Sequence, residues 1–238
     1  MTTTIELGDI SVDVVQKDIK NIHLSVYPPN GRVRLSAPAR MDADTIRVYA
    51  VSKLAWIRRQ QKKLQGQDRE TPRELLERES HYLWGQRYLL KLNEADGPSY
   101  VELKANTIVL HFHSDASVAK KLELLNDWYR TLLKDAVQPL IAKWEPRMGV
   151  EVARFFVQRM KTKWGICNPQ TRNIRLNLEL AKKPPECLEY IVVHEMVHLL
   201  EPTHNHRFIS LMDKFMPEWN VCRDTLNRLP VRHEEWGY

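Results

Sequence analysis

The chain has 238 residues and a formal net charge of +6, with 43% hydrophobic and 28% charged side chains. These are ordinary globular values, and a chain of this length can bury a sizeable core in one or two domains. No apolar run approaches the roughly 20 residues that a membrane-spanning helix requires, and the first residues lack the features of a signal peptide. Three cysteines without CxxC spacing argue against a disulfide framework. We therefore expect a soluble, cytoplasmic protein with no membrane partner.

The first part of the chain has the patterns of strands followed by a helix. Three stretches alternate apolar and polar residues as half-buried strands do: residues 10–15, 22–27 and 32–36. Asn30-Gly31 predicts a hairpin between the last two. A helix capped by Asp42 or Asp44 should follow, and Thr71-Pro72-Arg73-Glu74 combines a capping box with proline at the first helical position, predicting a short second helix.

The rest of the chain changes from strands to helices. Three further strands are predicted: residues 88–92, 100–104 and 107–112. Residues 118–144 have a helical pattern in which Pro139 predicts a kink or a break. A strand, a Trp-Gly turn, another strand and three helices should follow. The expected fold is α+β, with a β-rich amino-terminal region over 1–115 that contains two helices and a second region over 116–238, unless the two form one continuous domain.

The segment His194-Glu195-Met196-Val197-His198 carries the chemistry. Residues four apart lie on one face of a helix, so both imidazoles can bind one metal ion while Glu195 stays near its open position. This is the HExxH arrangement of zinc metalloproteases, with the glutamate as general base. The alternative is a histidine pair on a solvated helix face. The flanks favour the metal, because apolar neighbours predict a buried helix in which unpartnered polar groups are costly.

Catalytic zinc usually has three protein ligands. Pro202 should end the helix close to Leu200 and let the chain turn back, which makes His204 the expected third ligand. Three rival ligands lie further along: His206, Asp213 and Glu218. His206 is the nearest rival, although a role beside the metal or toward the substrate fits it better.

Several runs around this motif resemble those of the YgjP-like metallopeptidase family. They are Lys161-Thr162-Lys163-Trp164-Gly165-Ile166-Cys167, Asn173-Ile174-Arg175-Leu176-Asn177, Pro184-Pro185 and Thr203-His204 to Phe208, with Ser36-Ala37-Pro38, Trp56-Ile57 and Leu83-Trp84-Gly85 in the same order further upstream. That family is similar in its catalytic core to the SprT and Wss1-type proteases, which act on DNA-bound proteins. The sequence departs from the family's pattern at Ile166, where serine is usual, and at Thr203, where asparagine is usual.

The resemblance implies a zincin-like catalytic region with a small sheet packed on the HExxH helix, and one Zn²⁺ per chain. It implies a zinc metalloendopeptidase with a polypeptide substrate. Residues 173–178 are then the candidate edge strand that pairs with the substrate; the alternative is an interior strand packed under the helix. The expected substrate-binding residues are Asn173, Arg175, Asn177 and His206, the last three being the candidates for the donor that stabilises the oxyanion.

Basic residues gather in two places. Eight lie between residues 152 and 183: Arg154, Arg159, Lys161, Lys163, Arg172, Arg175, Lys182 and Lys183. Six more lie along the predicted amino-terminal helix: Arg47, Lys53, Arg58, Arg59, Lys62 and Lys63. Such clusters can contact a phosphate backbone, although a solvated surface explains them as well. DNA or a DNA-bound protein is therefore a candidate partner, through the resemblance more than through charge.

Two other interpretations concern the metal. Cys167 is a candidate zinc ligand in a latent enzyme, but a buried free cysteine more often serves as a small apolar side chain. A non-catalytic interaction or nucleic-acid-binding module with structural zinc is the alternative to an enzyme, and it would need a fourth protein ligand such as Cys167 or His206. The expected mechanism is hydrolysis of peptide bonds by a metal-activated water, with Glu195 as general base.

Overall fold

The computed structural model describes residues 2–27, 31–65, 74–160 and 163–228. It is an α+β protein, as predicted, and it divides into two compact units between Thr71 and Pro72. The predicted boundary lay at 115/116. The difference arises because the strands before that point pack with the long helix after it, in the core of the second unit. No helix within the described ranges is long and apolar enough to cross a membrane.

The first unit is a four-stranded sheet with two helices. Its elements are β1 (Thr2–Leu7), β2 (Ile10–Lys17), β3 (His23–Tyr27), β4 (Arg32–Pro38), α1 (Ala43–Ser52) and α2 (Leu54–Gln65). The sheet order is β1-β2-β4-β3, with only β2 and β4 parallel. The three predicted strands are confirmed, and β1 was not predicted. The antiparallel pairing of β3 with β4, with Gly31 at a positive φ of 74°, agrees with the predicted hairpin.

The single helix predicted after β4 is two helices. Asp42 caps α1 by accepting a hydrogen bond from the Thr45 N–H at 2.8 Å, which confirms one of the two predicted caps. Lys53 leaves the helical conformation and ends α1 before α2 begins. Both helices pack on the sheet through an aliphatic core that includes Val12, Leu35, Ile46, Ala50 and Ile57.

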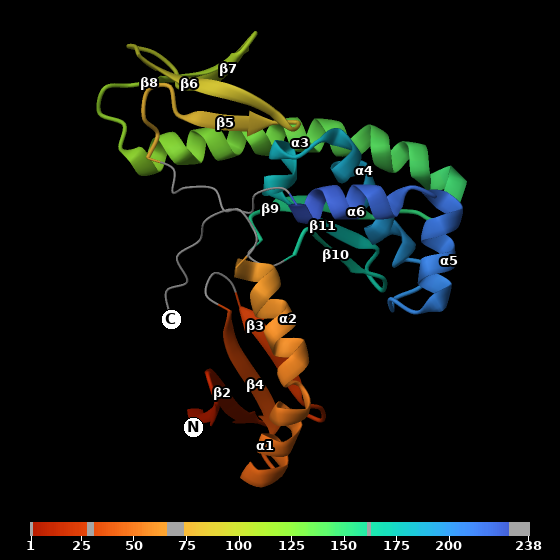
Figure 1. Ribbon diagram of the computed structural model, residues 1–238. Helices are drawn as coiled ribbons and strands as arrows, with labels where there is room; N and C mark the ends of the chain where they lie inside the picture. Colours follow the sequence, from red (N-terminus) through yellow and green to blue (C-terminus); the bar gives the residue numbers. More distant parts are fainter. Residues whose placement is uncertain (1, 28–30, 66–73, 161–162, 229–238) are drawn as a thin grey trace. The chain divides into compact units, whose positions relative to one another are not determined.

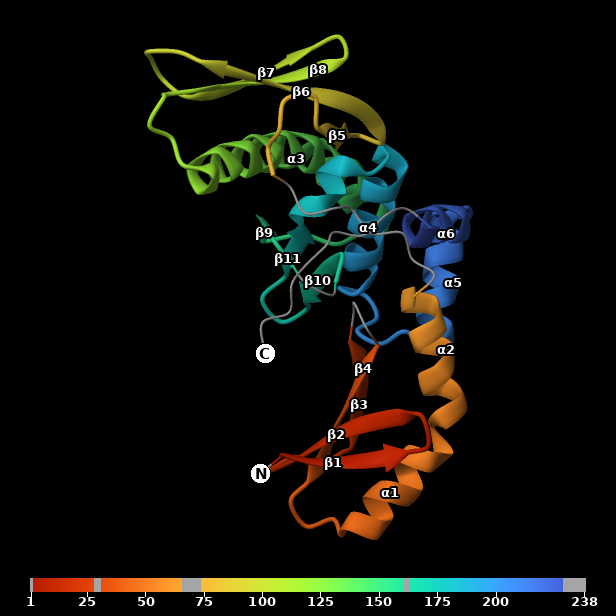
Figure 2. The same cartoon turned by 60° about the vertical axis from the view of Figure 1, so that its left-hand side comes forward.

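The second unit contains a further four-stranded sheet on a long helix. Its first elements are β5 (Ser80–Leu83), β6 (Gln86–Glu94), β7 (Tyr100–Lys104), β8 (Thr107–Phe112) and α3 (Val118–Met148). The sheet order is β5-β6-β8-β7, and Figures 1 and 2 show this sheet along one side of α3. The three predicted strands are confirmed, and the short β5 was not predicted.

Two predicted helical features differ in this unit. Thr71-Pro72-Arg73 lies outside the described residues, and residues 74–79, which follow, form a turn and no helix; Leu75 and Arg78 have positive φ values there. Of the kink or break predicted at Pro139, the break is wrong, because α3 continues through the proline. A buried stripe along α3 anchors it on both sides of the proline: Leu125, Tyr129, Leu133, Val137, Ile141, Trp144 and Met148.

A small sheet and the helices of the candidate site complete this unit. They are β9 (Arg154–Gln158), β10 (Gly165–Asn168), β11 (Asn173–Asn177), the 3₁₀ helix η1 (Leu178–Lys182), α4 (Pro185–Val197), α5 (His206–Phe215) and α6 (Trp219–Arg228). The sheet order is β10-β11-β9. Because β11 pairs on both sides, the prediction that residues 173–178 form an edge strand is wrong, and β10 is the edge nearest α4.

Candidate metal centre

Three imidazoles converge at the end of α4. His194 and His198 come from α4 and its C-cap, and His204 comes from the loop before α5. One ligand atom of each lies within 4.8 Å of the others, and the Nε2 atoms of His194 and His204 are 3.0 Å apart. Within the described residues this is the one group of three or more histidine, cysteine or acidic side chains with metal-site spacing.

The local sequence explains why His204 returns to the helix. The α-helical pattern ends at Val197, and the chain turns over the next residues. The Glu201 carboxylate accepts hydrogen bonds from the Thr203 N–H and hydroxyl at 3.3 and 2.9 Å, which fixes the turn after Pro202. Asn205 then caps α5 by accepting from the Phe208 N–H at 3.0 Å. His204 therefore lies in a loop held at both ends.

Phe208 supports all three imidazoles from the first turn of α5. Its buried ring lies with its centre 4.9 Å from that of His194 and 4.7 Å from those of His198 and His204. Sequence reasoning treated this residue only as the end of a run. Its function is to pack the triad into one arrangement, because a rigid aromatic ring leaves each imidazole little freedom.

Burial favours the neutral form of His194 and His198, which is the form that binds metal. Burial, followed by the neighbouring His198 and His204, lowers the pKa of His194 to about 3. Burial also lowers the pKa of His198. The Nδ1 atom of His198 lies 3.1 Å from the Glu201 carbonyl oxygen, which fixes the ring and leaves Nε2 for a ligand. Three imidazole nitrogen donors in this geometry fit a divalent ion such as zinc.

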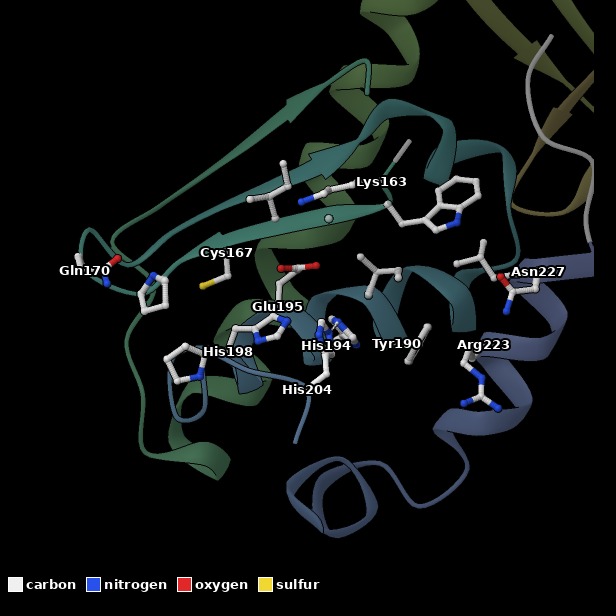
Figure 3. A pocket seen from close by; sticks show the side chains of 17 residues that line it. Lys163, Cys167, Gln170, Tyr190, His194, Glu195, His198, His204, Arg223 and Asn227 are labelled. Atoms are coloured by element: carbon white, nitrogen blue, oxygen red, sulfur yellow. Dashed lines mark hydrogen bonds between the residues drawn. The ribbon is translucent and has the colours of Figure 1, made fainter. Parts of the chain in front are cut away.

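Glu195 lies beside the triad, and its side chain is buried against β10. Burial raises the pKa of Glu195 to about 8, while the Lys163 ammonium and the backbone N–H of Cys167 lower it. Figure 3 shows the Glu195 carboxylate between β10 and α4, and the imidazoles of the triad lie farther from β10. A carboxyl group that titrates near neutral pH can both accept and return a proton.

The triad and Glu195 line a cavity of about 540 Å³. β10 forms one wall, and α4 and α6 contribute the opposite side (Figure 3). The residues that contribute polar groups besides Glu195 and the triad are Lys163, Gln170, Tyr190, Arg223 and Asn227. A cavity with an exposed strand edge on one side has the shape required for an extended chain.

The four predicted substrate-binding residues do not line this cavity. Asn173 pairs within the sheet, and the Arg175 guanidinium lies over the Phe156 ring at 5.7 Å. The buried Asn177 donates hydrogen bonds to the carbonyls of Met160 and Lys163 at 2.9 and 2.8 Å. His206 begins α5 with its side chain exposed. The substrate assignment of Asn177 is therefore corrected, since its amide is used to hold the chain before β10.

The rival metal ligands also lie outside the triad. Asp213 accepts a hydrogen bond from the Trp219 indole at 2.8 Å, and Glu218 is exposed. The Cys167 sulfur is absent from the group of described ligand atoms that meet at the centre. Burial, then the nearby Glu195, raises the pKa of the Cys167 thiol to about 12, so the thiolate that zinc requires is disfavoured.

Several residues of the cavity were not predicted from the sequence, among them Tyr190 and Arg223, and the position of Gly165 was not predicted either. Tyr190 lies one turn before His194, and this four-residue spacing was a visible signal for the same helix face. Arg223 gave no signal, because only the packing of α6 on α4 brings it to the cavity. Gly165 belonged to the Trp-Gly turn in the sequence, but in the structure it lies directly against Glu195.

Two solved structures are similar to part of this chain. The crystal structure of the metallopeptidase zymogen abylysin of Pyrococcus abyssi matches with 22% identity and a TM-score of 0.36, over 40% of this chain and 99% of that chain. The zymogen of Methanocaldococcus jannaschii jannalysin matches with 21% identity and a TM-score of 0.32, over 40% of this chain and 92% of that chain. A search of curated proteins finds no match.

The match to a family is more extensive. The model described as "YgjP-like, metallopeptidase domain" matches residues 20–229, which covers most of both compact units. This confirms the resemblance seen in the sequence, and with it the prediction of a hydrolase that acts on polypeptides. The chain belongs to the YgjP-like metallopeptidase family.

Proposed function

We propose that the protein is a zinc-dependent endopeptidase in which His194, His198 and His204 hold the metal and Glu195 is the general base. The observation that carries the proposal is the convergence of three imidazoles with a buried carboxylate beside them in an open cavity. Zinc bound there would lower the pKa of a water molecule and polarise the scissile carbonyl. Side chains of the protein carry out the proton transfers and the binding of the substrate.

Glu195 moves the proton in this mechanism. Its carboxylate takes a proton from the attacking water and then delivers it to the nitrogen of the departing amine. Without a metal ion, burial raises the pKa of Glu195 to about 8, and the charge of a bound divalent ion would favour the ionised form that accepts the proton. The hydrogen bond from the Cys167 N–H holds the carboxylate on the β10 side.

The edge of β10 is the proposed site for the substrate backbone. Within the described chain β10 pairs only with β11, so its other edge is not paired with a strand and runs along the cavity beside Glu195. A peptide can add to such an edge through main-chain hydrogen bonds, which give affinity with little demand on sequence. This replaces residues 173–178, which lie inside the sheet.

Tyr190 is the proposed donor for the oxyanion. Its ring packs edge-on against His194, with centres 5.8 Å apart, and the residue lines the cavity. Burial raises the pKa of its hydroxyl to about 12, so it stays a hydrogen-bond donor over the working range of a hydrolase. A donor aimed at the developing charge is a major contributor to acyl-transfer catalysis.

The number of ligands supports a catalytic site over a structural one. Structural zinc is usually closed by four protein ligands, whereas the described group has three. Replacing Glu195 by glutamine tests the assignment. The variant should bind one zinc per chain and hydrolyse unfolded protein about 10²–10⁴-fold more slowly. Loss of zinc together with activity would contradict the role of general base.

Contact with DNA or DNA-bound proteins stays a prediction. Several of the basic residues that suggested it are used within the protein: Lys182 with Glu179, Arg172 with Glu151, and Arg58 with Asp9. These pairs reduce the charge free for a phosphate backbone. Binding of single- and double-stranded DNA measured at low ionic strength tests it directly, since such binding weakens steeply with salt.

A further inference from the structure

Gly165 has an unusual neighbour. A methyl group built on its Cα would lie 2.6 Å from Cγ and 2.7 Å from Cδ of Glu195, closer than real carbon contacts permit. Gly165 is not among the glycines with positive φ, so the backbone itself does not require glycine here. The three atoms nearest to such a methyl group all belong to Glu195, so the absence of a side chain makes room for that residue.

The strand that carries Gly165 is fixed in place. Gly165 pairs with the buried Leu176 of β11. The Asn177 backbone N–H donates to the Trp164 carbonyl at 2.9 Å, and the Asn177 amide holds the carbonyl of Lys163 at 2.8 Å. Lys163 and Trp164, which come directly before Gly165, cannot shift without breaking these hydrogen bonds, which is costly.

The helix on the other side is fixed as well. Val193, Met196 and Val197 flank Glu195 on α4 and are fully buried in the core of this unit. A dense core resists displacement of a helix backbone. A side chain added at position 165 must therefore displace the Glu195 side chain from its present rotamer, away from the Cys167 N–H that bonds to it.

We infer that Gly165 is a positioning residue: its bare Cα, with the Cys167 N–H, forms a carboxylate seat that holds Glu195 at the metal centre. The catalytic consequence of this inference rests on the proposed function, but the steric contact between position 165 and Glu195 does not. Asn177 contributes by pinning the turn that carries Gly165. The role differs from ligand binding, because Gly165 would act through Glu195 alone.

The first test is Gly165→Ala in the zinc-loaded protein. We expect kcat to fall about 10²-fold, as a displacement near 1 Å can cause, with KM and zinc content unchanged. In a Glu195→Gln background the same substitution should cost no further activity. Gly149→Ala is the matched control: Gly149 has a φ of 69° and open space around it, so alanine there costs stability and leaves kcat unchanged. Full activity of Gly165→Ala would overturn the inference.

The second test needs no activity. Gly165→Ala should lower the Tm of the metal-free protein by about 2–8 °C through overpacking. In a Glu195→Ala background, which removes the crowded atoms, most of that decrease should disappear. An equal decrease in both backgrounds would overturn the inference. If the decrease in Tm depends on Glu195 but Glu195→Gln remains fully active, the carboxylate seat is supported and the proposed function is wrong.

Discussion

β10 and β11 are adjacent antiparallel strands that differ in their position relative to the cavity. β11 contains polar residues that suggested substrate binding, yet it lies in the middle of its sheet. The Asn177 side chain donates its hydrogen bonds to the carbonyls of Met160 and Lys163, before β10. β10 contains Gly165, Ile166, Cys167 and Asn168, and the first three of these residues line the cavity. The difference teaches that the position of a strand in its sheet decides whether it lines the cavity, and that its polar side chains do not.

The largest expected effect concerns the three-histidine centre in the cavity that β10 lines. His204→Ala should reduce zinc binding and lower hydrolysis to the level of the metal-free protein, because only two ligands remain. His206→Ala is the matched control, since its exposed side chain begins α5 outside the triad. Zinc content by elemental analysis and hydrolysis of unfolded protein measure both. A zinc-free His206→Ala variant would reverse the choice of third ligand.

The next effect tests whether the cavity facing β10 supplies the oxyanion donor. Tyr190→Phe should lower kcat about 10²-fold with zinc content unchanged, because only the hydroxyl is removed. Arg175→Met is the contrast on β11. If Arg175→Met lowers kcat and Tyr190→Phe does not, the donor lies on β11 and the comparison of the strands is broken.

A smaller effect separates support from substrate binding on β11. Asn177→Ala should destabilise the protein by about 1–3 kcal/mol, because the hydrogen bonds from the buried Asn177 amide to the carbonyls of Met160 and Lys163 are lost. Denaturant unfolding measures the loss, and the KM for a peptide should not change. A raised KM with unchanged stability would restore Asn177 as a substrate ligand.

The smallest effect is expected at Arg175. Its guanidinium lies over the Phe156 ring, and the residue does not line the cavity. Arg175→Ala should therefore change neither kcat nor KM and should cost at most about 1 kcal/mol of stability, the worth of an exposed cation–π contact. Steady-state kinetics and denaturant unfolding on one preparation check both. A tenfold change in kcat/KM would show that β11 reaches the substrate.

Local patterns predicted much of the fold and the centre of the site. The alternation of apolar and polar residues predicted six strands. The spacing of His194 and His198, with Pro202 ending the helix, predicted that His204 lies beside them. The sequence did not predict that β11 is central, because strand order depends on pairing between distant segments. The proximity of Gly165 to Glu195 also depends on how β10 packs on α4, which no local pattern contains.

The most direct test of the central claim measures zinc and hydrolysis together in Glu195→Gln. The amide keeps the shape of the carboxylate but cannot take a proton from water. We predict one zinc per chain, unchanged folding and hydrolysis of unfolded protein slower by about 10²–10⁴-fold. A variant that binds zinc and hydrolyses as fast as the original protein would contradict Glu195 as the general base of this centre.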